Sequence, residues 1–146
     1  MKKKTFINCP LRGIAQVNIS ADDVKKARDW YAVFLGGDPY FQRPDADNPA
    51  YVEFRLGDYQ HELGIIDRNY LPEQTRDGLG GAIVRWHVDD LSTTLARLKE
   101  LGAHENEPRT ERGDGFATAS VIDPFGNILG LMHSPHYLQT LESCVK

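Results

Sequence analysis

An internal repeat limits what this chain can fold into more than any other feature of its sequence. The segment VNISADDVKKARDWYAVFLGG begins at Val17, and VRWHVDDLSTTLARLKELGA begins at Val84. Each opens with alternating residues, reaches an Asp pair, continues with a helical pattern and ends at glycine. Asp90 follows Asp23 by 67 residues (90 minus 23), close to half of the 146-residue chain. Such a period indicates a duplicated supersecondary unit.

Each copy predicts one helix after one strand. Apolar residues recur at three- and four-residue steps, which is typical of an amphipathic helix: Val24, Ala27, Trp30, Tyr31 and Phe34 in the first copy, and Leu91, Leu95, Leu98 and Leu101 in the second. An Asp can cap the first turn, and Gly36 or Gly102 can end the helix. Further strands are predicted at Tyr51–Gly57, Gln60–Ile66, Phe116–Ile122 and Asn127–Met132. The unit is therefore predicted to be β-α-β-β-β.

The two units are expected to form one α+β domain over residues 14–132, because neither copy is large enough to bury a core alone. The modules are placed at residues 14–66 and 82–132, with terminal extensions at 1–13 and 133–146. Residues 67–81 are interpreted as the linker, and residues 44–49 and 110–115 as turn-rich loops.

Charge and cysteine content restrict the possible partners and the compartment. Seventeen basic and 21 acidic residues give a net charge of −4, so no basic surface for nucleic acid or anionic lipid is expected. Two cysteines, Cys9 and Cys144, have no CxxC partner and predict neither a disulfide framework nor a thiolate zinc site. A cytoplasmic protein with a small-molecule partner, and with neither nucleic acid nor membrane as partner, is the expectation.

Alternation along the predicted strands separates an apolar face from a polar one. The polar face carries amide, carboxylate, guanidinium and imidazole groups together with aromatic rings, including Gln16, Asn18, Tyr51, Glu53, Arg55, Arg85 and His87. A face that simply meets water is the plain interpretation. This mixture of groups instead favours a cleft or a subunit interface.

The duplicated unit, together with DPFGN from Asp123 to Asn127 before a final apolar strand, resembles the vicinal oxygen chelate superfamily. That superfamily includes glyoxalase I, extradiol dioxygenases and bleomycin-resistance proteins. The resemblance spans residues 14–132 and implies tandem modules forming a curved mixed sheet around a cavity, and a homodimer. DPFGN itself is interpreted as a tight turn, with Gly126 at positive φ.

Metal-dependent members of that superfamily take two ligands from each module, from its first and last strands. The resemblance places Gln16 and Glu62 at the first module's ligand positions. Ile83 and Gly130 occupy the second module's positions, where they cannot coordinate. The two modules can also be matched one step differently, so that Gly64 corresponds to Gly130. In that match Glu62 is no longer at a ligand position either. The family implies a divalent metal (Ni, Zn, Mn or Fe), whereas the missing donors favour none tightly bound.

Three functional hypotheses follow. One is a glyoxalase-like lyase or dioxygenase, in which Gln16 and Glu62 hold the metal and Glu62 or His87 moves a proton. Another is a metal-free module that binds a small molecule or antibiotic through the polar face, namely Gln16, Asn18, Glu53, Glu62, Arg85 and His87. Arg85 would pair with Glu53 or Glu62 to recognise a carboxylate, or form an ordinary ion pair within the sheet. In the third hypothesis the polar face serves only as a dimer interface.

Overall fold

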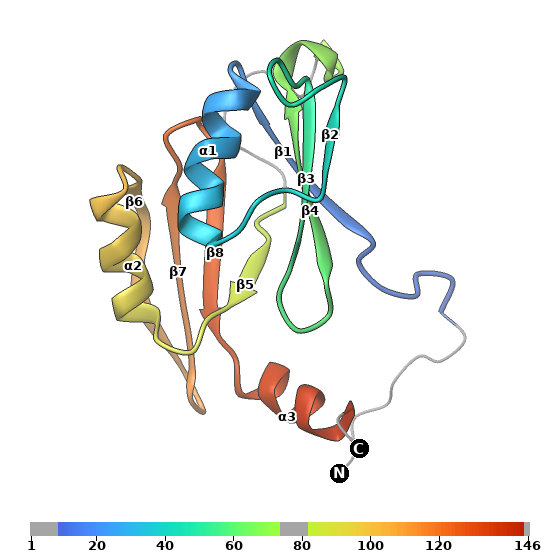
Figure 1. The fold of residues 1–146 in the computed structure, drawn as a ribbon. Helices are drawn as coiled ribbons and strands as arrows, with labels where there is room; N and C mark the ends of the chain where they lie inside the picture. Colours follow the sequence, from blue (N-terminus) through green and yellow to red (C-terminus); the bar gives the residue numbers. More distant parts are fainter. Residues whose placement is uncertain (1–8, 74–81, 145–146) are drawn as a thin grey trace.

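The computed structural model describes residues 9–73 and 82–144, and within them each half of the chain builds its own sheet and helix (Figure 1). The first half contains β1 (Gln16–Ala21), α1 (Val24–Leu35), β2 (Phe41–Arg43), β3 (Tyr51–Leu56), β4 (His61–Asp67) and a 3-10 turn (Arg68–Tyr70). The second contains β5 (Arg85–His87), α2 (Leu91–Glu100), β6 (His104–Gly113), β7 (Phe116–Ile122), β8 (Ile128–His133) and α3 (Pro135–Cys144). Among these helices, none has the length and apolar character needed to cross a membrane.

Both sheets repeat one topology. The strand orders are β1-β4-β3-β2 and β5-β8-β7-β6. β1 runs parallel to β4 and β5 parallel to β8, while the remaining pairs are antiparallel. α1 packs on the first sheet and α2 on the second. The predicted α+β fold of two β-α-β-β-β units is confirmed, with the strands arranged as two four-stranded sheets.

The helix boundaries follow from the predicted caps. Asp23 accepts a hydrogen bond from the backbone N–H of Lys26, and Asp90 accepts one from Thr93. α1 ends where Gly36 adopts a left-handed conformation with φ 79°. Each Asp satisfies a backbone donor that the first helical turn leaves without a partner.

The apolar strand faces and helix stripes form two adjoining cores. One core is centred on Tyr31 and Ile65 and the other on Leu98 and Leu131, all of them almost fully buried. Trp30, Phe34 and Trp86 pack against both cores. Trp30 and Phe34 of the predicted helical stripe thus face the core, and together with Trp86 they join the two halves through apolar contact.

The loop predicted at residues 110–115 is wrong over most of its length, because β6 continues to Gly113. The turn is confined to Asp114 and Gly115, which have φ of 54° and 87°. β6 is an edge strand with the charged, mostly exposed sequence HENEPRTERG, so it lacks the alternation that identifies half-buried strands. The linker prediction is also partly wrong, since Asp67 belongs to β4; residues 74–81 lie outside the described residues.

The DPFGN segment forms the predicted turn and also connects the halves. Asp123 accepts hydrogen bonds from the backbone N–H groups of Phe125 (2.9 Å) and Asn127 (2.8 Å). Its other oxygen accepts a 2.6 Å bond from the Tyr31 hydroxyl on α1. The Asn127 side chain bonds both the N–H and the carbonyl of Ser20 in β1. The turn of the second half is therefore fixed to a strand and a helix of the first.

We expect Tyr31→Phe to lower the free energy of unfolding by about 1–3 kcal/mol, because it removes a hydrogen bond to a buried carboxylate. Urea unfolding followed by circular dichroism measures the change. Tyr70→Phe is the matched control, since Tyr70 is 70% exposed. Equal stability of the two variants would contradict a structural role for the bond between Tyr31 and Asp123.

Candidate functional site on the polar face of the first sheet

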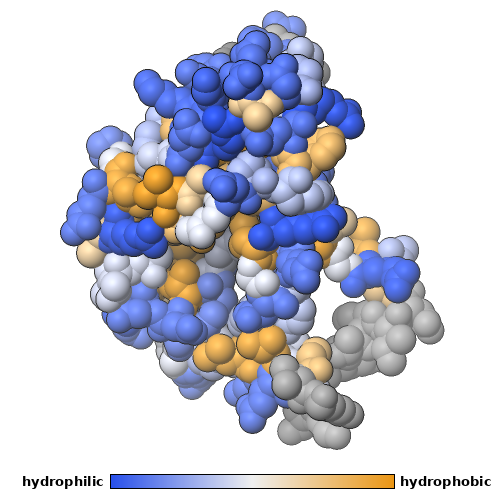
Figure 2. Space-filling model, in the orientation of Figure 1, coloured by the Kyte–Doolittle hydropathy of each residue, from blue (hydrophilic) through white to orange (hydrophobic). Residues whose placement is uncertain are grey.

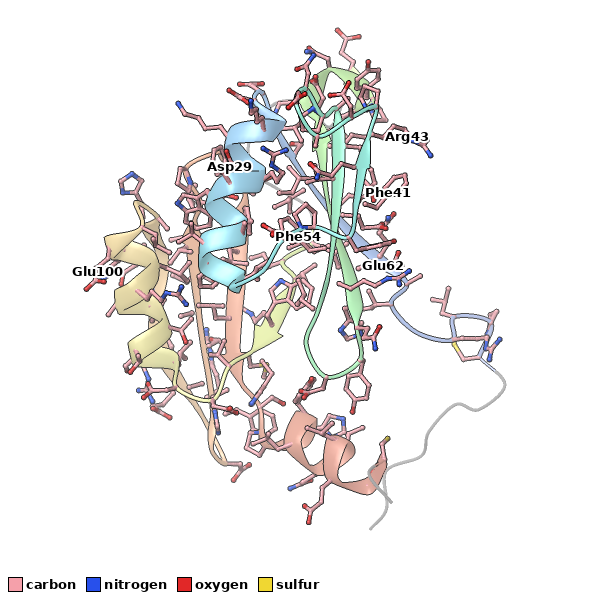
Figure 3. All side chains as sticks on the ribbon, viewed as in Figure 1. Asp29, Phe41, Arg43, Phe54, Glu62 and Glu100 are labelled. Atoms are coloured by element: carbon pink, nitrogen blue, oxygen red, sulfur yellow. The ribbon has the colours of Figure 1, made fainter. Side chains whose placement is uncertain are left out.

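Polar and aromatic side chains gather on the face of the first sheet that points away from α1. Figure 3 shows Phe41, Arg43 and Glu62 on this side. The hydrogen-bonded cluster on this face consists of Gln16 and Asn18 from β1, Tyr40 just before β2, Tyr51, Glu53 and Arg55 from β3, and Glu62 from β4. The strand register sets Gln16 and Arg55 on either side of Glu62. Alternation and register thus bring these residues together.

Glu53 is the centre of this cluster and is only 6% exposed. Its Oε1 accepts hydrogen bonds from Gln16 Nε2 (2.5 Å) and the Tyr51 hydroxyl (2.7 Å). Its Oε2 accepts a bond from the Tyr40 hydroxyl. A carboxylate removed from water must be compensated in this way, and three donors hold Glu53 in one orientation.

The same contacts fix the charge state of the cluster. Burial alone would raise the pKa of Glu53, but the hydrogen bonds from Tyr40, Tyr51 and Gln16 outweigh it and lower the pKa below its ordinary value. Burial and the bond to Glu53 raise the pKa of Tyr51. The cluster therefore keeps an ionised carboxylate beside a protonated phenol at neutral pH.

Glu62 and Arg55 form the more open edge of the cluster. Glu62 Oε1 lies 3.3 Å from both the Tyr40 hydroxyl and an Arg55 guanidinium nitrogen. The Arg55 guanidinium stacks 3.9 Å above the centre of the Tyr40 ring. The side chains of Arg55 and Glu62 remain 48% and 30% exposed, so both can reach a ligand.

The other predicted site residues lie apart from this cluster. Arg85 does not pair with Glu53 or Glu62; it forms a 2.9 Å ion pair with Glu107 of β6, which fits the alternative of an ion pair within the sheet. His87 Nδ1 accepts the backbone N–H of Ser134 at 3.0 Å, and its Nε2 lies 3.1 Å from Asp89. Both nitrogens of His87 are thus engaged. The catalytic roles of His87 and Glu62 stay predictions. The ligand-binding role of Arg85 also stays a prediction.

The sheet register determines how the modules correspond. Gly64 pairs with Asn18, and Gly130 pairs with Arg85, which follows Asn18 by the repeat period. Gly64 and Gly130 are therefore equivalent, as in the shifted match. A Cβ at Gly64 would overlap the Asn18 side-chain oxygen and lie 2.7 Å from the Tyr51 hydroxyl, and a Cβ at Gly130 would collide with the Val84 carbonyl. Gly64 could accept a side chain only if the ends of Asn18 and Tyr51 moved aside, and at Gly130 the backbone itself is in the way.

These observations test whether the residues fit the divalent metal that the resemblance implies. Within residues 9–73 and 82–144, no three or more His, Cys, Asp or Glu side chains are grouped so that they could hold a metal ion. Gln16 and Glu62 are neighbours, but the Gln16 amide donates to Glu53 and Tyr51. Ile83 has no donor atom. The donor set does not fit a chelated metal.

Sequence reasoning missed Tyr40, Tyr51 and Arg55 as site residues. The alternation of β3 already placed Tyr51 and Arg55 beside Glu53, and this signal was sufficient to include them. Tyr40 precedes a three-residue strand that no periodic pattern marks, and it reaches Glu53 only through the pairing of β2 with β3.

Comparisons with known proteins agree with this fold. The family model described as Glyoxalase/Bleomycin resistance protein/Dioxygenase superfamily matches residues 13–131. No curated protein matches the sequence. A superfamily member from Sphaerobacter thermophilus has a TM-score of 0.66 and 20% identity, covering 84% of this chain and 97% of that one.

Two further solved structures show the same fold. A glyoxalase-related enzyme from Fulvimarina pelagi has a TM-score of 0.66 and 19% identity, covering 86% of this chain and 90% of its own. The antibiotic-binding protein TnmS3 from Streptomyces sp. CB03234 has a TM-score of 0.61 and 22% identity, covering 84% and 96%.

We expect Glu53→Gln to lower the free energy of unfolding by about 1–3 kcal/mol at pH 7, because the donors around the carboxylate lose their charged acceptor. A carboxyl group whose pKa is lowered by folding stabilises the protein above its unfolded pKa, and this contribution is lost as the pH falls through the folded pKa. The difference between wild type and variant should therefore shrink towards pH 3 in urea unfolding.

The matched control is Glu100→Gln, because Glu100 lies exposed on α2 (Figure 3). It should unfold like the wild type at both pH values. A Glu53→Gln variant whose deficit does not change with pH would show that Glu53 is not held as an anion.

Proposed function

Because this chain belongs to the Glyoxalase/Bleomycin resistance protein/Dioxygenase superfamily, we propose that it binds a small organic molecule on the polar face of its first sheet without a metal. The observation that carries the proposal is the steric closure of Gly64 and Gly130, the equivalent strand positions. At Gly64, the space that a ligand side chain would need is filled by Asn18 and Tyr51, which are themselves residues of the polar face.

The chemistry of the cluster supports recognition of a polar ligand. Glu53 and its three donors form a rigid base in which each group already has a partner. Arg55 and Glu62, at the edge, present a planar donor fork and an acceptor. A ring bearing a carboxylate or a hydroxyl offers complementary groups. The antibiotic-binding activity named for TnmS3 belongs to the same class of function.

A second copy of the chain is the proposed cover for this face. Tyr40 and Phe41 are 47% and 37% exposed on the sheet that carries the cluster. Tyrosine and phenylalanine are enriched at protein–protein interfaces relative to the rest of the surface. We propose a homodimer in which the polar faces of the two copies enclose the ligand.

Benzoate and phenol are suitable probes of the binding proposal. We expect one or both to shift the backbone amide NMR signals of β1, β3 and β4, equally with and without EDTA. Arg55→Ala should weaken benzoate binding at least about tenfold, because the charged hydrogen bonds involved are worth about 1.5–3 kcal/mol. Arg109→Ala is the matched control, because Arg109 lies on the edge strand of the second sheet and its side chain is 45% exposed, close to that of Arg55. Binding that disappears with EDTA, or stoichiometric metal in protein purified without chelator, would overturn the metal-free proposal.

The dimer is tested by analytical ultracentrifugation. Wild type should sediment as a dimer at micromolar concentration. Phe41→Glu should sediment as a monomer, because it places a charge among the aromatic rings of the interface. Val33→Glu changes an exposed valine of α1 and should leave the dimer intact. A monomeric wild type, or a dimer unaffected by Phe41→Glu, would contradict this interface.

A further inference from the structure

A cavity lies between the two halves of the molecule, on the side of the first sheet opposite to the polar cluster. Its volume is about 410 Å³, within the usual range for small-molecule sites. Its walls come from α1, β1, the β3–β4 hairpin, β5, β8 and α3, including Val17, Phe34, Leu56, His61, Trp86 and Tyr137. Figure 2 shows hydrophobic surface between the two halves. Gln16, Glu53 and Glu62 are not among the lining residues, so this cavity is separate from the polar face.

Aromatic and imidazole rings line one side of the cavity. The His61 ring lies 6.2 Å from Trp86 and 5.8 Å from Tyr59. Tyr59 lies behind these rings, outside the cavity lining, and contacts Tyr137 at 5.9 Å. Tyr137 stacks on His87 at 4.8 Å with only 8° between the ring planes. These rings offer flat surfaces and edges to a planar aromatic molecule.

Two polar groups of the cavity have unused hydrogen-bonding capacity. Neither the His61 imidazole nor the Trp86 indole N–H makes a hydrogen bond to any described residue, whereas the Trp30 N–H donates to the Leu101 carbonyl at 2.7 Å. In the described part of the chain, no fully buried side-chain nitrogen or oxygen lacks a partner. Because the Trp86 N–H has no such partner, it is not fully buried, and it is open to a ligand or to water. His61 and Trp86 can together hold an oxygen atom of a ligand.

The C-terminal helix closes the cavity through Tyr137. The Tyr137 hydroxyl donates a 2.7 Å hydrogen bond to Asp58 in the β3–β4 turn, while its ring stacks on His87 of β5. Burial, followed by the bond to Asp58, raises the pKa of Tyr137 to about 12, so the donor keeps its proton at neutral pH. α3 has no buried residue of its own, and Tyr137 therefore supplies much of its attachment.

We propose that this cavity binds a planar aromatic molecule that carries a hydroxyl or carbonyl oxygen, and that Tyr137 of α3 closes over it. The apolar walls take the ring system, and His61 and Trp86 take the oxygen. The site is distinct from the polar-face cluster and requires neither a metal nor a second copy of the chain.

The test measures binding of 2-naphthol by isothermal titration calorimetry. Val17→Phe enlarges a side chain that lines the cavity and should weaken binding at least tenfold. Val33→Phe makes the same change at a position that is 58% exposed on α1, and should bind like the wild type. No binding to wild type, or equal binding to both variants, would overturn the proposal.

A second variant tests the closing residue and keeps the test valid if Val17→Phe does not fold. Tyr137→Ala removes the ring and the bond to Asp58, and should weaken 2-naphthol binding severalfold while α1 and both sheets stay folded. Tyr70→Ala, an exposed tyrosine outside the cavity, is the control and should have no effect. Unchanged binding in Tyr137→Ala would overturn the role of α3. Loss of binding in Phe41→Ala would place the probe on the polar face and overturn the proposal.

Discussion

The buried carboxylate of Asp123 is the interaction on which the rest of the structure depends. It is 2% exposed and is satisfied only when its own turn is formed and α1 of the other half is in place. An ionised group without partners in such a position would cost several kcal/mol. The turn and α1 must therefore form together, and Asn127 adds β1 to the same contact. Arg68 donates a further 2.7 Å bond to the Phe125 carbonyl, so the end of the first half holds the same turn.

The two halves share one topology but carry different polar residues at equivalent positions. Glu53 pairs with Gly64 in the first sheet, and Ser120 pairs with Gly130 in the second, so the two residues occupy equivalent central positions. Around Glu53 are two tyrosines and an amide; around Ser120 are Glu107 and Asn106 from the edge strand. The backbone is repeated, whereas the polar chemistry is not. Ligand recognition through a polar sheet face is therefore proposed for the first sheet only.

Much of the fold could be predicted because periodicity shows which side of a helix or strand is apolar. α1, β3 and β7 each have one face in a core, and their alternation or helical spacing is clear. β6 is exposed and charged, so no burial pattern marks it. For the site, alternation correctly placed Gln16 and Glu53 on one face. The contact from Tyr40, and the equivalence of Gly64 with Gly130, depend on strand register, which a single sequence does not encode locally.

The closed glycine positions also limit how the protein can change over evolutionary time. At Gly64 the ends of the Asn18 and Tyr51 side chains stand in the way, so a donor residue could be introduced there only if these side chains moved aside or were replaced. At Gly130 the obstacle is the backbone carbonyl of Val84, which no side-chain substitution removes. No single mutation leads from this chain to a four-ligand chelate site. Steric exclusion by the backbone thus keeps a donor side chain from Gly130, whereas the polar groups that now occupy the face of the first sheet are open to variation.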